Sequence, residues 1–267
     1  MVIYSQGEYL LFEKATVPIG DHGYLYGVGL FETFRSWRGG CFQYLHSHLE
    51  RLLQGCRFYG IEADALGLAS KTSLRAVLAE LLERNNIEDA VFRLTVSAGE
   101  TPDRGLPIGP YRSPRESILV RPLPPEPLGP IRLHVLKTVR TQPETPVRAK
   151  SSHYFNSLSG YRELRSGEAR PGDEGIMFSA DGRVVEGTTT NVFVVRNGLL
   201  LTPPVETGLL PGIARSAVLD LARKAGIPVA ETDVRLPPGK PSQGSALKLK
   251  INSGSDFLSL AAVLGLF

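Results

Sequence analysis

The segment RAKSSHYFNSL, residues 148–158, surrounds a single lysine, Lys150, with small and polar side chains. The pattern predicts that Lys150 lies at the junction of a strand and a helix, with Tyr154 four residues further on. A lysine that forms an imine needs a partly desolvated site that lowers its pKa, and short neighbours such as Ala149 and Ser151 leave room for a bound group. A lone lysine is more often a solvated surface charge, so other segments must support this interpretation.

A second segment, VVEGTTTN, carries Glu186 between a predicted strand and a turn that ends in Thr190 and Asn191. A carboxylate there can face a pyridine nitrogen and keep it protonated, so that the ring accepts electrons from a carbanion. The alternative is a strand-end carboxylate in a polar turn, which this segment alone does not exclude.

Two further segments offer groups that bind phosphate. In LLPGIARSAV, Pro211, Gly212 and Ile213 begin a predicted helix whose free N–H groups and dipole suit a phosphate. In HSHLERL, Arg51 lies on a predicted helix and carries a guanidinium that can bind phosphate oxygens. Proline and glycine also begin ordinary helices, and most helix arginines are solvated, so neither signal is specific by itself.

The composition is that of an ordinary folded protein. The chain has 267 residues, 42% of them hydrophobic and 21% charged, and is long enough for one large or two modest domains. Its net charge is +3 and its basic residues are scattered, which argues against nucleic-acid binding. The sequence shows no long apolar run and no signal-peptide pattern, so we expect a cytoplasmic protein without a membrane partner.

Two cysteines, Cys41 and Cys56, give no disulfide framework and are expected to be free thiols. Together with His46 and His48 they could be drawn as a zinc site. Their spacing matches no usual zinc motif, so we expect no metal.

The order of the predicted elements indicates an α+β protein with two domains. Residues 1–120 form a small α+β domain and residues 131–267 a larger strand-rich domain, joined by the proline-rich linker RPLPPEPLGP at 121–130. Docking of an SH3-type module to this linker is the alternative. Strands or hairpins are predicted over residues 1–20, 29–37, 41–45, 90–99, 117–121, 131–139, 175–187, 191–204 and 227–236, and helices over 46–59, 70–84, 153–166 and 213–226.

Five segments taken together resemble the class IV aminotransferase-like enzymes, which have the fold type IV architecture and use pyridoxal 5′-phosphate. These segments are DHGYLYGVGLFETFR, HLERL, AKSSHYFNSL, EGTTTNVF and TPPVETGLLPGI. They occur in the family's order over roughly residues 1 to 235. The resemblance implies a two-domain fold, with a small N-terminal α/β domain and a larger C-terminal pseudo-barrel, and it implies a homodimer acting on a small-molecule substrate.

The resemblance also implies roles for individual residues. Lys150 would form the Schiff base with the cofactor and act as the catalytic base. The other cofactor-binding residues it implies are Glu186 at the pyridine nitrogen, Tyr154 at the ring hydroxyl, Arg51 with the amides of Gly212 and Ile213 at the phosphate, and Thr190 and Asn191 in the cofactor cleft. The resemblance also implies that Thr33 and Arg35 face the substrate if the predicted strand 29–37 presents that side. By alternation they share one face of the strand with Phe31, whereas Glu32, Phe34 and Ser36 share the other.

Two departures from the family pattern stand out. Family members often have threonine after the Gly-Ile pair, whereas this chain has Ala214, so one hydroxyl is missing at the phosphate while the backbone donors remain. After Leu236 the expected helix and strand are hard to find, and the tail, residues 237–267, looks divergent, truncated or frameshifted. Ser253 in that tail is the candidate for a second phosphate loop.

Within the family, FETFR, KSSHYFN and FRLTVSAG most resemble the aminodeoxychorismate lyases of folate biosynthesis. Branched-chain aminotransferases typically carry FEG where this chain has Phe31, Glu32 and Thr33, and D-amino-acid aminotransferases are close relatives. We therefore expect a carbon–oxygen lyase that converts 4-amino-4-deoxychorismate to 4-aminobenzoate and pyruvate. The alternatives are an aminotransferase for branched-chain or D-amino acids and an inactive paralogue with a binding role.

Overall fold

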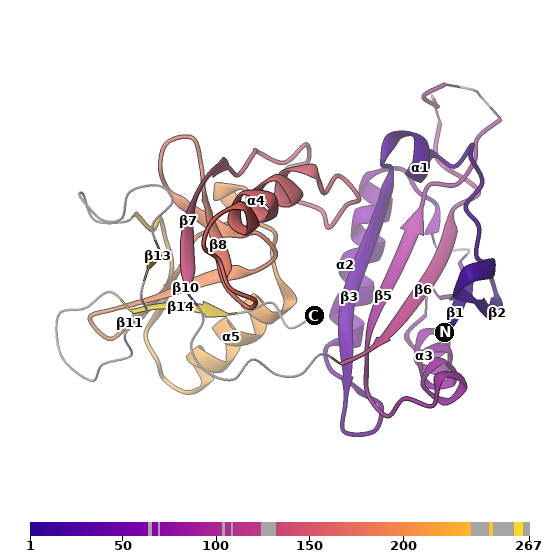
Figure 1. Ribbon diagram of the computed structural model, residues 1–267, viewed down its shortest axis with the longest axis horizontal. Helices are drawn as coiled ribbons and strands as arrows, with labels where there is room; N and C mark the ends of the chain where they lie inside the picture. Colours follow the sequence, from indigo (N-terminus) through magenta and orange to yellow (C-terminus); the bar gives the residue numbers. More distant parts are fainter. Residues whose placement is uncertain are drawn as a thin grey trace. The chain divides into compact units, whose positions relative to one another are not determined.

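The structure is a computed structural model that describes residues 1–63, 66–68, 70–102, 105–107, 109–123, 132–235, 246–247 and 259–263. Contacts between residues divide the chain into two compact units. The first holds the described residues of Met1–Pro125 together with Lys150–His153. The second holds those of Glu126–Ala149 and Tyr154–Gly265. Both units mix helices and strands, which confirms the expected α+β class (Figure 1).

The first unit is built on a six-stranded sheet with the order β2-β1-β6-β5-β3-β4, in which every neighbouring pair is antiparallel. Its strands are β1 (Val2–Ser5), β2 (Glu8–Leu11), β3 (Gly29–Trp37), β4 (Cys41–Phe42), β5 (Ala90–Ser97) and β6 (Arg115–Pro122). The predicted alternation along β3 is confirmed, because Glu32, Phe34 and Ser36 are all buried. These side chains form one face of the strand, and Thr33 and Arg35 lie on the other.

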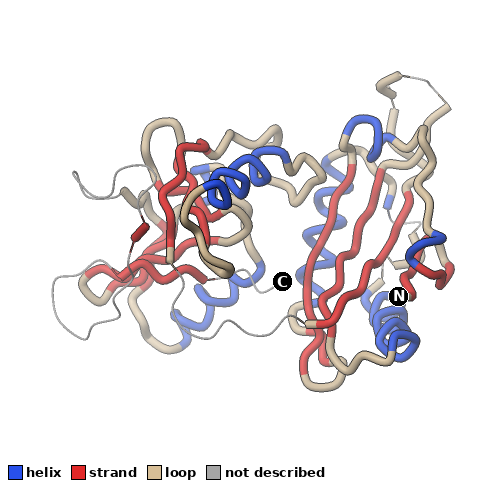
Figure 2. The backbone as a smooth tube through the Cα atoms, viewed as in Figure 1, coloured by secondary structure: helices blue, strands red, loops and turns tan. Residues whose placement is uncertain are grey.

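Two long helices belong to this unit, α2 (Leu45–Phe58) against β3 and α3 (Lys71–Asn85) against β1 (Figure 2). A third element, α1 (His22–Tyr26), lies in the glycine-rich segment between the predicted strands, where the sequence analysis predicts no helix. The Asp21 side chain accepts a hydrogen bond from the Gly23 N–H at 2.7 Å, and Gly27 ends the helix at φ +71°. The N-cap and C-cap explain this short helix in a sequence that has no helical periodicity.

The second unit contains two four-stranded sheets, ordered β12-β11-β10-β14 and β13-β7-β8-β9. The predicted hairpin turns are present, since Gly182 at φ +79° joins β8 to β9, and Asn197 and Gly198, both at positive φ, join β10 to β11. Buried side chains from both sheets, among them Leu133, Ile176 and Val192, pack into one core. The strands are β7 (Leu133–Val139), β8 (Glu174–Phe178), β9 (Val184–Gly187), β10 (Asn191–Arg196), β11 (Leu199–Thr202), β12 (Val229–Glu231), β13 (Ala246–Leu247) and β14 (Ser259–Val263).

Two helices complete the second unit, α4 (Phe155–Ser166) along β7 and α5 (Ile213–Lys224) beside β12. Part of the tail that the sequence left unassigned is β14, which pairs antiparallel with β10. Another part of the tail is β13, which pairs antiparallel with β7, so both strands extend the sheets of the second unit.

Lys150 lies between a strand and a helix, as the sequence indicates, but the two elements do not meet at Lys150. Strand β7 ends at Val139 and helix α4 begins at Phe155, so Lys150 lies within the connection. Its carbonyl accepts a hydrogen bond from the Phe31 N–H at 2.9 Å, and Ser151 forms a bridge with Leu30. This pairing attaches Lys150–His153 to the first unit, whereas the sequence-based limits place them in the second domain.

The predicted linker lies largely outside the described residues, so the domain limits 1–120, 121–130 and 131–267 stay a prediction. Within the described chain, no helix is both long and apolar enough to cross a membrane.

Gly99 gives a test of the first unit. It has φ +74°, and a Cβ there would overlap with the carbonyl oxygen of Ser113. Gly39 has φ +76° with open space around it, so an alanine there carries only the strain of positive φ. We expect Gly99→Ala to lower the free energy of unfolding by about 1–3 kcal/mol more than Gly39→Ala, measured by urea denaturation. Equal losses would show that the loop shifts without cost.

Asp173 gives a test of the second unit. It is buried and accepts hydrogen bonds from Arg132 at 2.6 Å, His134 at 3.0 Å and the Arg170 N–H at 2.8 Å. Burial by itself raises the pKa of Asp173, but the hydrogen bonds from Arg132, Arg170 and His134 outweigh it and hold the pKa well below its usual range. Asp173 in the native state is therefore protonated only at a lower pH than in the unfolded chain. The ionised carboxylate stabilises the fold fully above the ordinary pKa of an aspartate, and this stabilisation is lost as the pH falls.

We expect Asp173→Asn to lower the free energy of unfolding at pH 7 by about 2–3 kcal/mol. The difference from the unchanged protein should shrink as the pH falls below about 4, where the unfolded chain begins to be protonated. Thermal unfolding across pH 3–8 measures it, and a constant difference over that range would contradict the account.

Candidate functional site

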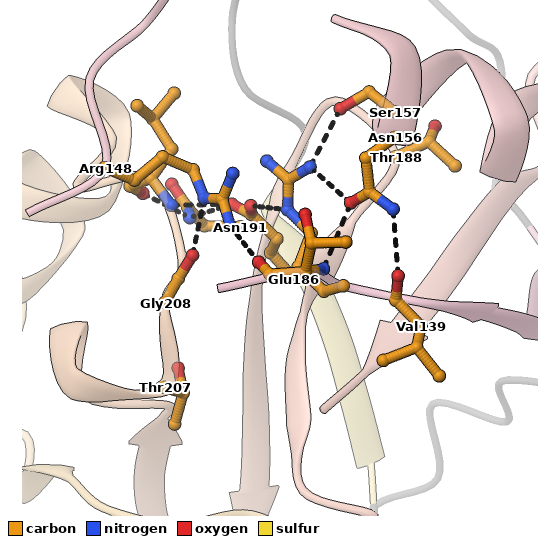
Figure 3. A network of polar contacts seen from close by, with 12 residues as sticks. Val139, Arg148, Asn156, Ser157, Glu186, Thr188, Asn191, Thr207 and Gly208 are labelled. Atoms are coloured by element: carbon orange, nitrogen blue, oxygen red, sulfur yellow. Dashed lines mark hydrogen bonds and ion pairs between the residues drawn. The ribbon is translucent and has the colours of Figure 1, made fainter. Parts of the chain in front are cut away.

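The Glu186 carboxylate is the centre of a buried polar cluster in the second unit (Figure 3). It lies on β9 between apolar neighbours and is 4% exposed. The Arg140 Nε donates to Oε1 at 2.7 Å and the Leu210 N–H donates to Oε2 at 3.0 Å. Burial raises the pKa of Glu186, while the charge of Arg140 and the Leu210 N–H oppose that shift. Glu186 is therefore a carboxylate held in a fixed orientation by matched donors.

Arg140 was not identified from the sequence. It follows the last residue of β7 and is held by the first turn of α4, where its NH1 donates to Asn156 Oδ1 at 2.9 Å and to Ser157 Oγ at 3.3 Å. Asn156 in turn donates to the Val139 carbonyl at 2.9 Å. An arginine just after a strand carries no signal of its own, and only the fold brings it to Glu186.

A second arginine, Arg148, lies in the same connection two residues before Lys150. Its Nε donates to the Gly208 carbonyl at 2.6 Å, and its NH2 donates to the Thr141 carbonyl. Its charge also favours the ionised form of Glu186. Arg148 therefore fastens this connection to the segment that precedes α5.

Asn191 links Glu186 to the start of helix α5. Its Nδ2 donates to the Leu210 carbonyl at 2.9 Å and lies 3.4 Å from Glu186 Oε2. Gly212 is the N-cap of α5, and a Cβ at Gly212 would collide with Asn191 Oδ1. Ile213 and Ala214 form the first turn of the helix, so their backbone N–H groups lie at its positive end. A side chain at position 212 would therefore displace the Asn191 amide where the helix start meets the cluster.

The Thr190 side chain turns toward a different carboxylate. Its Oγ1 donates to Glu174 Oε2 at 3.2 Å, and the Thr188 hydroxyl donates to Glu174 Oε1 at 2.6 Å. Glu174 is buried and also receives the N–H groups of Gly175 and Thr188. Glu174 therefore shapes the threonine turn that precedes Asn191, and a direct role of Thr190 in cofactor binding stays a prediction.

Lys150 belongs to the first unit and lies beside the aromatic ring of Phe31. Its Nζ is 4.7 Å from the ring centroid, and the Arg93 guanidinium carbon is 3.5 Å from the same centroid. Phe31 is itself buried. The amine that the sequence identified is thus placed against an apolar, electron-rich ring, and the same ring is in contact with Arg93, which sequence reasoning missed.

Arg51 lies on α2 in the same unit and is paired with Glu32. Thr33 is opposite Arg93 in the register of β3 and β5, on the face that carries Phe31 and Arg35. The Arg35 guanidinium is 4.9 Å from the ring of Trp37.

The structure thus shows the predicted residues as two groups, one in each unit. Lys150, Thr33, Arg35 and Arg51 belong to the first unit, and Glu186, Asn191, Gly212 and the first turn of α5 belong to the second. Tyr154 is the N-cap residue of α4 and is 40% exposed. Ser253 lies outside the described residues. Cys41 and Cys56 are free thiols, as expected.

Comparison with known proteins shows that the sequence is similar to class IV amino-transferases and to enzymes related to them. The family model for amino-transferase class IV matches residues 29–238. The chain is 36% identical over 230 residues to the aminodeoxychorismate lyase of Bacillus subtilis, covering 85% of this chain and 75% of that protein. It is 30% identical over 242 residues to the branched-chain-amino-acid aminotransferase of Salmonella typhimurium, covering 86% of this chain and 75% of that enzyme.

Solved structures show the same two kinds of enzyme. The branched-chain aminotransferase of Thermoproteus uzoniensis superposes with a TM-score of 0.76 at 30% identity and covers 88% of this chain and 78% of that one. The 4-amino-4-deoxychorismate lyase of Pseudomonas aeruginosa superposes with a TM-score of 0.72 at 28% identity and covers 88% of this chain and 82% of that one. The expected two-domain architecture of fold type IV is therefore confirmed.

The pair of Arg140 and Glu186 gives a test of the cluster. Arg140→Met leaves a buried carboxylate without its cation, and we expect it to lower the free energy of unfolding by about 3 kcal/mol or more. Glu186→Gln in the Arg140→Met background should restore part of that loss, because it removes the unmatched charge. A double-mutant cycle by urea denaturation measures the coupling, and additive losses would mean that the two side chains do not stabilise each other.

Proposed function

Because the chain belongs to the amino-transferase class IV family, we propose that it is an aminodeoxychorismate lyase, which converts 4-amino-4-deoxychorismate to 4-aminobenzoate and pyruvate. The observation that carries this proposal is the 36% identity to the Bacillus subtilis lyase over most of the chain. The segments FETFR and FRLTVSAG in β3 and β5 support it. The proposal includes a cytoplasmic homodimer that acts in folate biosynthesis.

Pyridoxal 5′-phosphate is the cofactor of this family, and the donor groups of this chain fit it. Lys150 supplies an amine beside a buried aromatic ring, and Glu186 supplies a carboxylate fixed by Arg140. At the start of the 12-residue helix α5, the backbone N–H groups of Gly212 and Ile213 lie at the positive end of the helix, where an anion is stabilised. When bound, the cofactor supplies a pyridinium ring that accepts the electron pair of a broken C–H bond next to nitrogen.

Lys150 is the catalytic residue in this proposal. Its Nζ holds the cofactor before substrate arrives, and once released it removes the proton from the amine-bearing ring carbon of the substrate. The ring C–O bond then breaks and the ring becomes aromatic, which makes the elimination effectively irreversible. The enolpyruvate that leaves takes up a proton to become pyruvate. The Phe31 ring beside Nζ excludes water on that side of the amine.

Glu186 keeps the ring nitrogen protonated in this proposal. A carboxylate that is to accept an N–H hydrogen bond must be ionised and correctly oriented, although its burial raises its pKa. Arg140 and the Leu210 N–H hold both of its oxygens in place. Arg140 is therefore a positioning residue for Glu186.

The phosphate is assigned to Arg51 and to the amides of Gly212 and Ile213. A guanidinium binds phosphate oxygens in a fork, and a helix N-terminus offers free N–H groups with a favourable dipole. Ala214 has no hydroxyl, so at the start of α5 only backbone N–H groups are available to bind the phosphate. Tyr154 is assigned to the ring hydroxyl, Thr190 and Asn191 to the surroundings of the cofactor, and Thr33 and Arg35 to the substrate.

An aminotransferase for branched-chain or D-amino acids is the second candidate. The observation that favours it is the identity to branched-chain aminotransferases, which is 35% over 239 residues for the putative enzyme of Methanocaldococcus jannaschii and 30% for the solved structure from Thermoproteus uzoniensis. Such an enzyme uses the same Lys150 and Glu186 and differs in the residues that contact the substrate.

The direct test is incubation of the cofactor-loaded protein with 4-amino-4-deoxychorismate. We expect 4-aminobenzoate and pyruvate in equal amounts, and a loss of both by at least about 1000-fold in Lys150→Ala, because the variant lacks its base. Conversion of L-leucine or D-alanine to a 2-oxo acid without 4-aminobenzoate would instead establish the aminotransferase. A folded, cofactor-loaded protein that performs neither reaction would contradict both candidates.

A further inference from the structure

The Glu32 carboxylate is a buried charge that the proposed chemistry leaves unexplained. It lies on β3, and its side chain is 1% exposed. Removing an ionised carboxylate from water costs several kcal/mol unless cations and donors compensate for it. A neutral residue would fill the same space in this strand without that cost, so the charge calls for an explanation.

Two side chains of α2 meet this carboxylate. Arg51 donates from Nε to Glu32 Oε1 at 2.7 Å and from NH2 to Oε2 at 2.7 Å, which is a bidentate pair. The His48 Nδ1 lies 2.7 Å from Oε2. His48 and Arg51 are three residues apart on the helix and so share the face that packs on β3. Burial alone would raise the pKa of Glu32, but the hydrogen bonds from His48 and Arg51 lower it below its ordinary value.

We propose that Glu32, supported by His48, is a positioning residue that presets the Arg51 guanidinium for the cofactor phosphate. This inference rests on the proposed function, because it takes Arg51 to be a phosphate ligand. An arginine side chain that is mobile before binding loses rotamer entropy of about 2 kcal/mol when it is fixed. With two of its nitrogens already held by Glu32, Arg51 loses that entropy during folding, so the phosphate binds more tightly.

The competing explanation is that the pair only holds α2 against β3. In that case, losing Glu32 would weaken the fold and affect every form of the cofactor equally. A positioning role affects only the form that carries a phosphate. Pyridoxal, which lacks the phosphate but keeps the ring and the aldehyde, separates the two explanations.

The experiment titrates apoprotein with pyridoxal 5′-phosphate and with pyridoxal, and follows the absorbance of the lysine-bound chromophore. For Glu32→Gln we expect the Kd for pyridoxal phosphate to rise about tenfold or more, which corresponds to the loss of a charge-assisted hydrogen bond. The Kd for pyridoxal should change less than about twofold, since no contact to the ring is altered.

Asp173→Asn is the matched control, because Asp173 is also a buried acid that pairs with one arginine and one histidine. It should lower stability without changing the ratio of the two Kd values. Glu32→Asp keeps the charge on a shorter side chain and replaces Glu32→Gln if that variant does not fold. It should also raise the Kd for pyridoxal phosphate more than the Kd for pyridoxal, but by a smaller factor than Glu32→Gln. Equal weakening of both ligands, or no weakening of either, overturns the positioning role.

Arg51→Gln tells a failure of this inference from a failure of the proposed function. If Arg51→Gln weakens only pyridoxal phosphate while Glu32→Gln does not, Arg51 binds the phosphate without help and the positioning role is wrong. If Arg51→Gln leaves the ratio of the two Kd values unchanged, Arg51 is not the phosphate ligand and both assignments fall.

Discussion

A carboxylate taken out of water must be met by cations and hydrogen-bond donors, and much of this structure follows from that requirement at Glu186. The acid is 4% exposed and receives donors from three separate segments, namely Arg140 after β7, Asn191 at the start of β10, and the Leu210 N–H before α5. Each donor fixes the end of a secondary-structure element. The cluster therefore sets the relative positions of β7, β10 and α5 within the second unit.

The same requirement recurs in the first unit at Glu32, where the cation is Arg51 and the second donor is His48. In both places an arginine matches a buried acid, and in both the pair lies at a residue that the family resemblance assigns to the cofactor. Lys150 follows a different principle. Its segment pairs through the backbone with the start of β3, and its amine lies against the Phe31 ring. Backbone pairing thus decides where the Lys150 amine lies, while charge matching decides how the acids are oriented.

Much of the fold could be predicted from local signals. The alternation along β3, the hairpin over residues 191–204 and the Pro-Gly start of α5 each depend on residues close together in the chain, and each is confirmed. The candidate acid and the helix start, Glu186 and Gly212, were found in the same way. What the sequence missed depends on distant contacts, because nothing near Arg140 indicates a carboxylate 46 residues away. The short helix α1 was also missed, since its caps and not its periodicity define it.

The pairing of Lys150 with β3 was hidden for a similar reason. A bridge between Leu30 and Ser151 joins segments more than a hundred residues apart, and neither segment shows by itself that it has a partner. The central claim is that Lys150 carries the cofactor. Reduction of the cofactor-loaded protein with sodium borohydride, followed by proteolysis and peptide mass spectrometry, tests it most directly. The account predicts a phosphopyridoxyl group on Lys150, and the same group on another lysine, or on none, would contradict it.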